Sequence, residues 1–382
     1  MKKNYISSVA ILLGTIVGAG IFGIPYAISK SGVIPGFFYL LILGGAVLLV
    51  HLFFGEVILR TDGKYRLVGY TQKYLGKWSK VLITISIFIG SVGSLLAFSI
   101  LAGDFLKIIF SSFPAPFSNI STLSFTLVFL ASLSFFIFHG IKLIAPVEIV
   151  TNIAFFAIIF IIFLLGAPKV DFQNFPLINT DNLFLPYGII LFSVVGWMAI
   201  PEVMEVLKGH EEKKNLKKVL IFGSISSVLL YAFFSFVVLG VSGKGTSPEA
   251  LWGLVPFLGN KIVFFGALAA IITLADSFLI TGVSLRNTLV YDFKFSKPMA
   301  ALITCSLPLV LFLVGFRGFI GTIGFVGTVV GVIDGVIILL MYRCAKKKCD
   351  REPEYRMNIH PFLIYLLISI FILGGLIQFF VF

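Results

Sequence analysis

The sequence predicts an all-α polytopic membrane protein, and three observations support this fold class. First, 59% of the 382 residues are hydrophobic, only 12% are charged, and the mean hydropathy is +1.08. A soluble domain of this length does not have such a composition. Second, the apolar residues form segments of roughly 20 residues, the length a helix needs to cross a bilayer. Third, glycine and proline interrupt two of these segments in similar patterns.

About eleven apolar segments follow one another, and no soluble domain is expected between them. The run after Met1-Lys2-Lys3 is too long for a signal peptide and lacks a small-residue cleavage site, so it is counted as the first span. The predicted spans cover residues 6–29, 33–59, 81–110, 121–139, 145–167, 183–206, 219–243, 260–285, 298–315, 319–342 and 360–382.

Charge asymmetry predicts the orientation of these spans. With a cytoplasmic N-terminus, all but six of the 29 lysines and arginines fall on the inner side. Such an excess of positive charge is typical of cytoplasmic loops, so the C-terminus is expected outside. The net charge of +12 is spread over alternating short loops, which argues against a nucleic-acid partner. The six exceptions are Lys30, Lys107, Lys169, Lys244, Lys261 and Arg317.

The first span contains a glycine-rich stretch that predicts a broken helix. Four glycines and Pro25 lie within the twelve residues 14–25. Each glycine costs about 1 kcal/mol of helix propensity relative to alanine, and proline about 3 kcal/mol. In hydrocarbon, broken helices occur only where the freed backbone lines a cavity or is buried in protein. Free N–H groups near Gly18–Ile21 would face an anion, as in secondary transporters. The alternative is that Gly14 and Gly18 form only a helix-packing face.

The sixth span repeats this pattern. Residues 193–196, Ser-Val-Val-Gly, match residues 15–18, Thr-Ile-Val-Gly, and Ile200-Pro201 matches Ile24-Pro25 with a slip of two positions. Five spans separate the starts of the two segments, and an odd number inverts the second copy relative to the first. Paired interrupted helices in corresponding positions indicate the binding site of a transporter.

With these motifs and the count of eleven, the chain resembles the amino acid/polyamine/organocation (APC) superfamily. It is most similar to the amino acid/auxin permease and the hydroxy/aromatic amino acid permease families. The resemblance implies a LeuT-type 5+5 inverted repeat, with repeats at 1–167 and 183–343 and a peripheral eleventh helix at 357–382. It also implies alternating access, in which spans 1, 2, 6 and 7 move against spans 3, 4, 8 and 9.

The resemblance also implies where an amino acid binds. Its carboxylate would meet the first break at Thr15, Val17, Gly18, Ala19 and Gly20. Its ammonium would meet backbone carbonyls of Ser193, Val194, Val195 and Gly196. Ser91 and Ser94 of span 3 are expected to line the pocket. Trp197 either closes the pocket or stacks over the substrate, and the alternative is simple packing.

Asp276 near the middle of span 8 is the main candidate for ion coupling. A charge in hydrocarbon is costly, so an intramembrane acid is a functional hypothesis by default. Thr273 and Ser277 share its helical face. Asp276 would carry a proton or help to bind sodium; a purely structural role is the alternative. The pattern departs from sodium-coupled relatives, which often have adjacent hydroxyls on span 8, because Thr273 and Ser277 are a turn apart. It also departs from proton-coupled relatives, some of which have a lysine in the middle of span 5, because Lys142 lies at the cytoplasmic end of that span. We expect H⁺ as the coupling ion, with Na⁺ as the alternative.

Two further acids are gate or packing candidates. Asp334 lies in the glycine-rich span 10, and Glu202 follows Pro201 at the second break, where it would cap the interruption or join a proton path. The three cysteines and four histidines are scattered. Neither a disulfide framework nor a metal site is therefore expected, and no cofactor is predicted.

The sequence thus predicts an ion-coupled symporter of amino acids in the cell (plasma or inner) membrane. Its expected partners are the amino acid and the lipid bilayer, and family kinship favours a neutral or aromatic side chain. An ion channel or a permease for another substrate is the alternative, although no filter-like repeat is present. An enzyme is disfavoured, because no catalytic constellation stands out at a membrane face and no P-loop is found.

Overall fold

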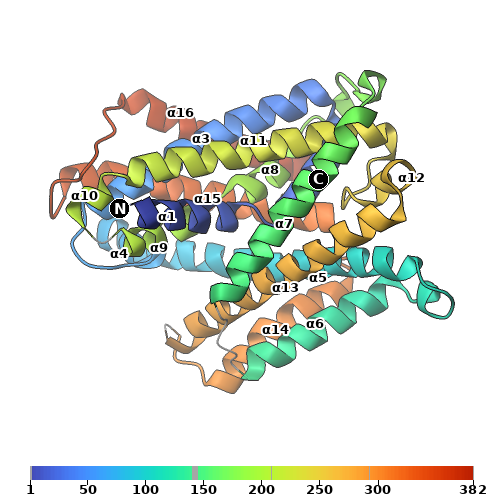
Figure 1. Ribbon diagram of the computed structural model, residues 1–382. Helices are drawn as coiled ribbons and strands as arrows, with labels where there is room; N and C mark the ends of the chain where they lie inside the picture. The colour runs from blue at the N-terminus through green and yellow to red at the C-terminus, as the bar shows by residue number, and fades with distance from the viewer. Residues whose placement is uncertain (1, 140–144, 208, 292, 382) are drawn as a thin grey trace.

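The computed structural model describes residues 2–139, 145–207, 209–291 and 293–381, so Lys142 lies outside the described residues. Within this part, every regular element is an α-helix or a short 3-10 helix (Figure 1). The α-helices are α1 (Lys2–Ile16), α2 (Gly20–Ser31), α3 (Val33–Leu59), α4 (Leu67–Leu75), α5 (Lys77–Ser111), α6 (Thr122–His139), α7 (Ala145–Gly166), α8 (Pro186–Val194), α9 (Ile200–Val206), α10 (His210–Lys213), α11 (Leu216–Ser242), α12 (Val255–Leu258), α13 (Asn260–Tyr291), α14 (Lys297–Val314), α15 (Phe319–Lys347) and α16 (Pro361–Val381).

The helices confirm the predicted spans. In the described residues, nine helical segments are long and apolar enough to cross a membrane, and α8 with α9 count as one of them. The bent pair α1 and α2 forms a further span, and α7 coincides with the fifth predicted segment. Large apolar side chains such as Leu41 and Phe380 point outward and are 70% and 88% exposed. In a protein of this composition, such a surface faces lipid. The chain is therefore an integral membrane protein.

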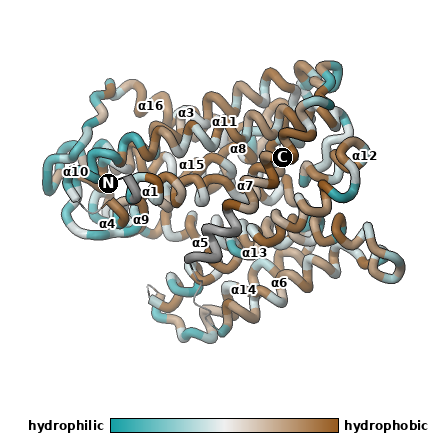
Figure 2. Tube along the Cα trace, viewed as in Figure 1, coloured by the Kyte–Doolittle hydropathy of each residue, from teal (hydrophilic) through white to brown (hydrophobic). Residues whose placement is uncertain are grey.

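Hydrophilic residues gather at the ends of the bundle. Figure 2 shows hydrophobic residues along the long helices and hydrophilic residues around the N-terminus, α4 and α10. We call this end, which carries the N-terminus, α4, α9, α10 and the loop 348–360, the N-terminal end. Polar loops at the ends and apolar side chains between them are what a bilayer requires.

The long helices pack in two groups. One group contains α5, α6, α13 and α14, and the other contains α1, α2, α3, α8, α9 and α11 (Figure 1). These are spans 3, 4, 8 and 9 against spans 1, 2, 6 and 7, the grouping that the resemblance implied. Helix α15 packs on both groups, since it contacts α5 and also α3 and α8.

Both predicted interruptions are present. Helix α1 ends at Ile16 and α2 begins at Gly20, with an angle of 52° between the two halves of the span. In the sixth span, α8 ends at Val194, and the 3-10 helix η5 (Trp197–Ala199) leads into α9. Pro201 lies in the first turn of α9, where a missing N–H leaves no helical hydrogen bond unmade.

Candidate functional site

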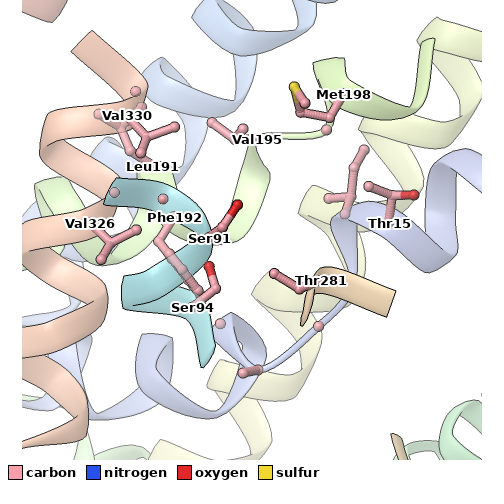
Figure 3. Close-up of a pocket in the computed structure, with 18 of the residues that line it drawn as sticks. Thr15, Ser91, Ser94, Leu191, Phe192, Val195, Met198, Thr281, Val326 and Val330 are labelled. Atoms are coloured by element: carbon pink, nitrogen blue, oxygen red, sulfur yellow. The ribbon is translucent and has the colours of Figure 1, made fainter. Parts of the chain in front are cut away.

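A cavity of about 270 Å³ lies where the two broken helices meet. Its walls come from both breaks, from α5 and α15, and from Thr281 of α13. Figure 3 shows Thr15, Ser91 and Val195 around the open space, with Val326 and Val330 on another wall. A largely apolar cavity with a few converging polar groups is the usual form of a small-molecule site.

The first break leaves two N–H groups without an acceptor. The N–H of Val17 donates to the carbonyl of Leu13 at 2.8 Å, and that of Gly18 to Ile16 at 3.1 Å. The N–H groups of Ala19 and Gly20, at the start of α2, donate to no acceptor in the described part of the chain. Free N–H groups at the start of a helix form an anion site.

The same break leaves free carbonyl groups at the end of α1. The carbonyl oxygens of Gly14, Thr15 and Val17 accept no hydrogen bond from any described residue. The C-terminal end of a helix carries partial negative charge. The break therefore presents a site for negative charge and a site for positive charge side by side.

The two breaks touch at Gly20. A Cβ atom on Gly20 would lie 2.2 Å from Oγ and 2.8 Å from Cα of Ser193, so only glycine fits. At Gly18, by contrast, a Cβ atom would meet nothing within 4 Å, because this position faces the cavity. The two glycines therefore have different roles: one allows close contact between the breaks, and the other leaves room in the cavity.

His51 of α3 supports the second break. The N–H of Gly196 donates to Nε2 of His51 at 3.1 Å, and Nδ1 of His51 lies 2.9 Å from Oγ of Ser224. Since Nε2 accepts a hydrogen bond, the neutral ring carries its hydrogen on Nδ1 and donates it to Ser224. The sequence does not indicate this role, because a single histidine in an apolar span gives no sign of its partner.

Tyr231 of α11 ties the two breaks together. Its hydroxyl lies 2.7 Å from the carbonyl of Ile16 and 2.8 Å from the carbonyl of Ser193, and the side chain is fully buried. The sequence does not indicate the role of Tyr231 either. In the predicted ammonium site, the Ser193 carbonyl is thus occupied, and that of Gly196 accepts from Ala199. The carbonyls of Val194 and Val195 accept no hydrogen bond within the described residues.

Asp334 of α15 lies on the cavity wall and joins α5 to the second break. Its Oδ1 accepts from Ser86 at 2.6 Å, and its Oδ2 accepts from the indole N–H of Trp197 at 3.1 Å. The Trp197 ring is fully buried and edge-on to His51, so it lies behind the wall. A gate role for Trp197 stays a prediction.

The cavity brings together most of the residues predicted for substrate binding. Val17, Ser193, Val194 and Trp197 are buried beside it and are not part of its wall. The predicted residues on the wall are Thr15, Gly18, Ala19, Gly20, Ser91, Ser94, Val195 and Gly196.

The residues predicted for ion coupling lie apart from the cavity. Asp276 is partly buried in α13 and accepts no hydrogen bond within the described residues, and Thr273 donates to the carbonyl of Ala269 at 3.1 Å. Their helical face, which includes Ser277, reaches the wall only at Thr281. In the described part of the chain, no three metal-ligating side chains cluster.

Glu202 lies outside the cavity, at the N-terminal end. It pairs with Arg66 at 2.9 Å, and the two side chains are 53% and 57% exposed. Ion pairs this exposed contribute little to stability. Glu202 also lies in the first turn of α9, where a negative charge complements the helix dipole.

Comparisons with known proteins cover nearly the whole chain. The model of the tryptophan/tyrosine permease family matches residues 1–378. The chain is 22% identical over 368 residues to glutamine transporter 2 of Aliivibrio fischeri, with 94% of both chains covered. It is 26% identical over 282 residues to tyrosine permease of Enterobacter agglomerans, covering 70% of this chain and 65% of that permease. Its fold is similar to that of MhsT solved with L-phenylalanine, a LeuT-type structure, with a TM-score of 0.66, 15% identity, and 98% and 97% of the chains covered.

Proposed function

The chain belongs to the tryptophan/tyrosine permease family and is an amino acid permease, and on that premise we propose that it is an ion-coupled symporter working by alternating access. Its proposed cargo is a neutral or aromatic amino acid. The observation that carries the proposal is the cavity between two broken helices, with free N–H groups and free carbonyls at its edge.

The cavity offers complementary groups for the two charges of an amino acid. We place its carboxylate at the N–H groups of Ala19 and Gly20, and its ammonium at the carbonyls of Val194 and Val195. The apolar walls receive the side chain. The names of the two relatives, a glutamine transporter and a tyrosine permease, and the phenylalanine bound to MhsT support an uncharged side chain.

The two helix groups are the proposed moving parts. Spans 1, 2, 6 and 7 would rock against spans 3, 4, 8 and 9, and the repeats 1–167 and 183–343 would be the inverted halves. The positive charge at the N-terminal end supports a cytoplasmic N-terminus, an outside C-terminus and insertion in the cell membrane.

The proposed coupling ion is the proton, with sodium as the alternative. Asp276 is a carboxylate in the middle of α13 without a hydrogen-bond donor among the described residues, which supports proton binding. The free carbonyls of Gly14, Thr15 and Val17 support the alternative, since such groups coordinate sodium in transporters. Thr273 and Ser277 would assist either ion.

Uptake into proteoliposomes tests the proposal. Purified protein is supplied with pooled radiolabelled amino acids, with a proton gradient in one arm and a sodium gradient in another. We expect saturable accumulation with the proton gradient. Asp276→Asn should lose accumulation and retain exchange of labelled for unlabelled substrate.

The control is Asp181→Asn, which changes an exposed carboxylate in the loop before α8. It should transport like the unaltered protein. Ion conductance without saturable uptake would contradict the symporter and favour a channel.

A further inference from the structure

We propose that Asp334 selects the substrate by its side chain, favouring amino acids whose side chain ends in an uncharged hydrogen-bond donor. Phenol, indole and primary amide groups belong to this class. The inference rests on the proposed function and concerns the same cavity. It adds the group that recognises the far end of the substrate.

Among the described residues, Asp334 is the only ionisable side chain on the cavity wall. The other wall residues described are glycine, alanine, apolar or hydroxyl-bearing. A buried carboxylate is costly unless it receives hydrogen bonds or meets a positive charge. No lysine, arginine or histidine lines the cavity in the described residues. A donor on the occupant would add to the hydrogen bonds that Asp334 receives from Ser86 and Trp197.

The side chain of Asp334 is 1% exposed, and its two internal partners leave acceptor positions on both oxygens. A carboxylate has about four lone-pair positions on its two oxygens. Ser86 uses one position on Oδ1 and Trp197 uses one on Oδ2. Both partners also fix the orientation of the carboxylate, so that it can discriminate between substrates.

Contacts between α15 and the sixth span place Asp334 next to the second break. A Cβ atom on Gly331 would meet Leu191 at 2.9 Å, and Asp334, three residues on, binds Trp197. Gly20 of the first break contacts Ser193, which lies four residues before Trp197. The amides therefore lie at the first break, whereas Asp334 lies beside Trp197 at the second.

Ala19, Gly20 and Asp334 line the same cavity. A substrate with its carboxylate at Ala19 and Gly20 can extend its side chain toward Asp334. On the way it passes an apolar wall formed by Leu191, Phe192, Val326 and Val330 (Figure 3). The cavity therefore fits a side chain with an apolar body and one donor at its tip.

Competition in counterflow exchange tests the inference, because exchange does not depend on ion coupling. Tyrosine and phenylalanine differ only in the hydroxyl group and are compared as competitors. With the unaltered protein we expect tyrosine to compete at least about tenfold better, since a site built for a donor rejects the analogue without it. Glutamine and methionine, compared as competitors in the same way, give a second pair.

Asp334→Asn should bring the tyrosine-to-phenylalanine ratio close to one. The indole N–H of Trp197 can only donate a hydrogen bond, so the amide oxygen of the new asparagine accepts it. The NH₂ group of that asparagine then points toward Ser86 or the cavity. Ser86→Ala keeps the carboxylate and removes one internal donor, so the ratio should stay equal or rise. This second variant tests the inference even where Asp334→Asn does not fold.

Three results would overturn the inference. One is a ratio near one in the unaltered protein, and another is an unchanged ratio in Asp334→Asn. The third is a ratio that falls in Ser86→Ala. If Asp334→Asn loses only gradient-driven accumulation and keeps its ratio, Asp334 serves coupling instead. Absence of exchange with any amino acid would refute the proposed function itself, which is a distinguishable failure.

Discussion

At the scale of the residue, Gly18 and Gly20 show how the same residue type serves two purposes two positions apart. Gly20 allows backbone contact with Ser193, whereas Gly18 faces open space in the cavity. A substitution at Gly20 therefore acts on packing, and one at Gly18 acts on the substrate. The difference cannot be read from the glycine pattern in the sequence.

We predict that Gly20→Ala lowers the melting temperature and abolishes exchange, because the added methyl group collides with the Ser193 backbone. Gly18→Ala should fold normally and bind substrate more weakly, because its methyl group enters the cavity. Thermal unfolding in detergent and counterflow exchange measure the two effects. The control is Gly45→Ala in α3, where a Cβ atom also meets nothing within 4 Å and the position is exposed. Normal exchange in Gly20→Ala would refute the assigned contact.

Tyr231→Phe should lower both stability and transport rate. It leaves the buried carbonyls of Ile16 and Ser193 without their donor, which costs about 1–3 kcal/mol. The expected result is a lower melting temperature with slower exchange, since the two breaks are no longer tied. Tyr39→Phe is the matched control, because the Tyr39 hydroxyl forms no hydrogen bond within the described residues. Equal effects of the two substitutions would contradict the role of Tyr231.

At the scale of the element, the loop 348–360 connects α15 and α16 and binds the N-terminal end of the bundle. Asp350 pairs with Lys73 of α4 and accepts from the N–H of Asp62 at 2.8 Å. Its own N–H donates to the carbonyl of Arg60 at 3.0 Å. This loop therefore fixes α4 beside the end of α3.

The ion pair between Lys73 and Asp350 predicts how the stability of the fold depends on pH. The hydrogen bond from Lys73 holds the pKa of the Asp350 carboxyl below its usual range, and the same bond raises the pKa of Lys73. A lowered carboxyl pKa stabilises the fold at pH values above the pKa of the unfolded chain, which is about 3.9. This contribution disappears as the pH falls through the pKa of the folded protein. A raised lysine pKa stabilises the fold below about 10.4, and this contribution is lost as pH rises further.

Asp350→Asn should therefore be less stable than the unaltered protein between about pH 4 and pH 10, and the difference should shrink as pH falls below about 4 and disappear below the folded pKa of Asp350. Melting temperatures across this range provide the measurement. A difference that stays constant down to pH 3 would show that the charge is not the cause. Asp181→Asn, in an exposed loop, controls for a general effect of removing a carboxylate.

At the scale of the whole molecule, α15 lies between the two helix groups. Through Asp334 it contacts Ser86 in one group and Trp197 in the other. A movement of one group against the other would change these bonds. The cavity and its selecting residue are thus at the interface that alternating access would alter.

The proposed orientation predicts which cysteines react from outside. In intact cells, a membrane-impermeant maleimide should label Asp181→Cys and leave the native Cys349 unmodified. Cys349 is exposed at the N-terminal end, which we place in the cytoplasm. Permeabilised cells should show labelling of both positions. Modification of Cys349 in intact cells would reverse the proposed orientation.

The membrane class, the order of the spans and both interruptions could be predicted from the amino-acid sequence. These are local properties, because hydropathy and the helix-breaking effect of glycine act within a short stretch of chain. The positions around Gly18 and Val195 could therefore be placed at a cavity in advance.

The distant residues that complete the site could not be predicted, because helix packing brings them together. Tyr231 meets Ile16 across 215 positions, and Ser86 meets Asp334 across 248. The sequence indicates the depth of an acid in a span and not the direction it faces. Asp334 therefore lies on the cavity wall and Asp276 does not, because helix packing sets the direction in which each carboxylate points.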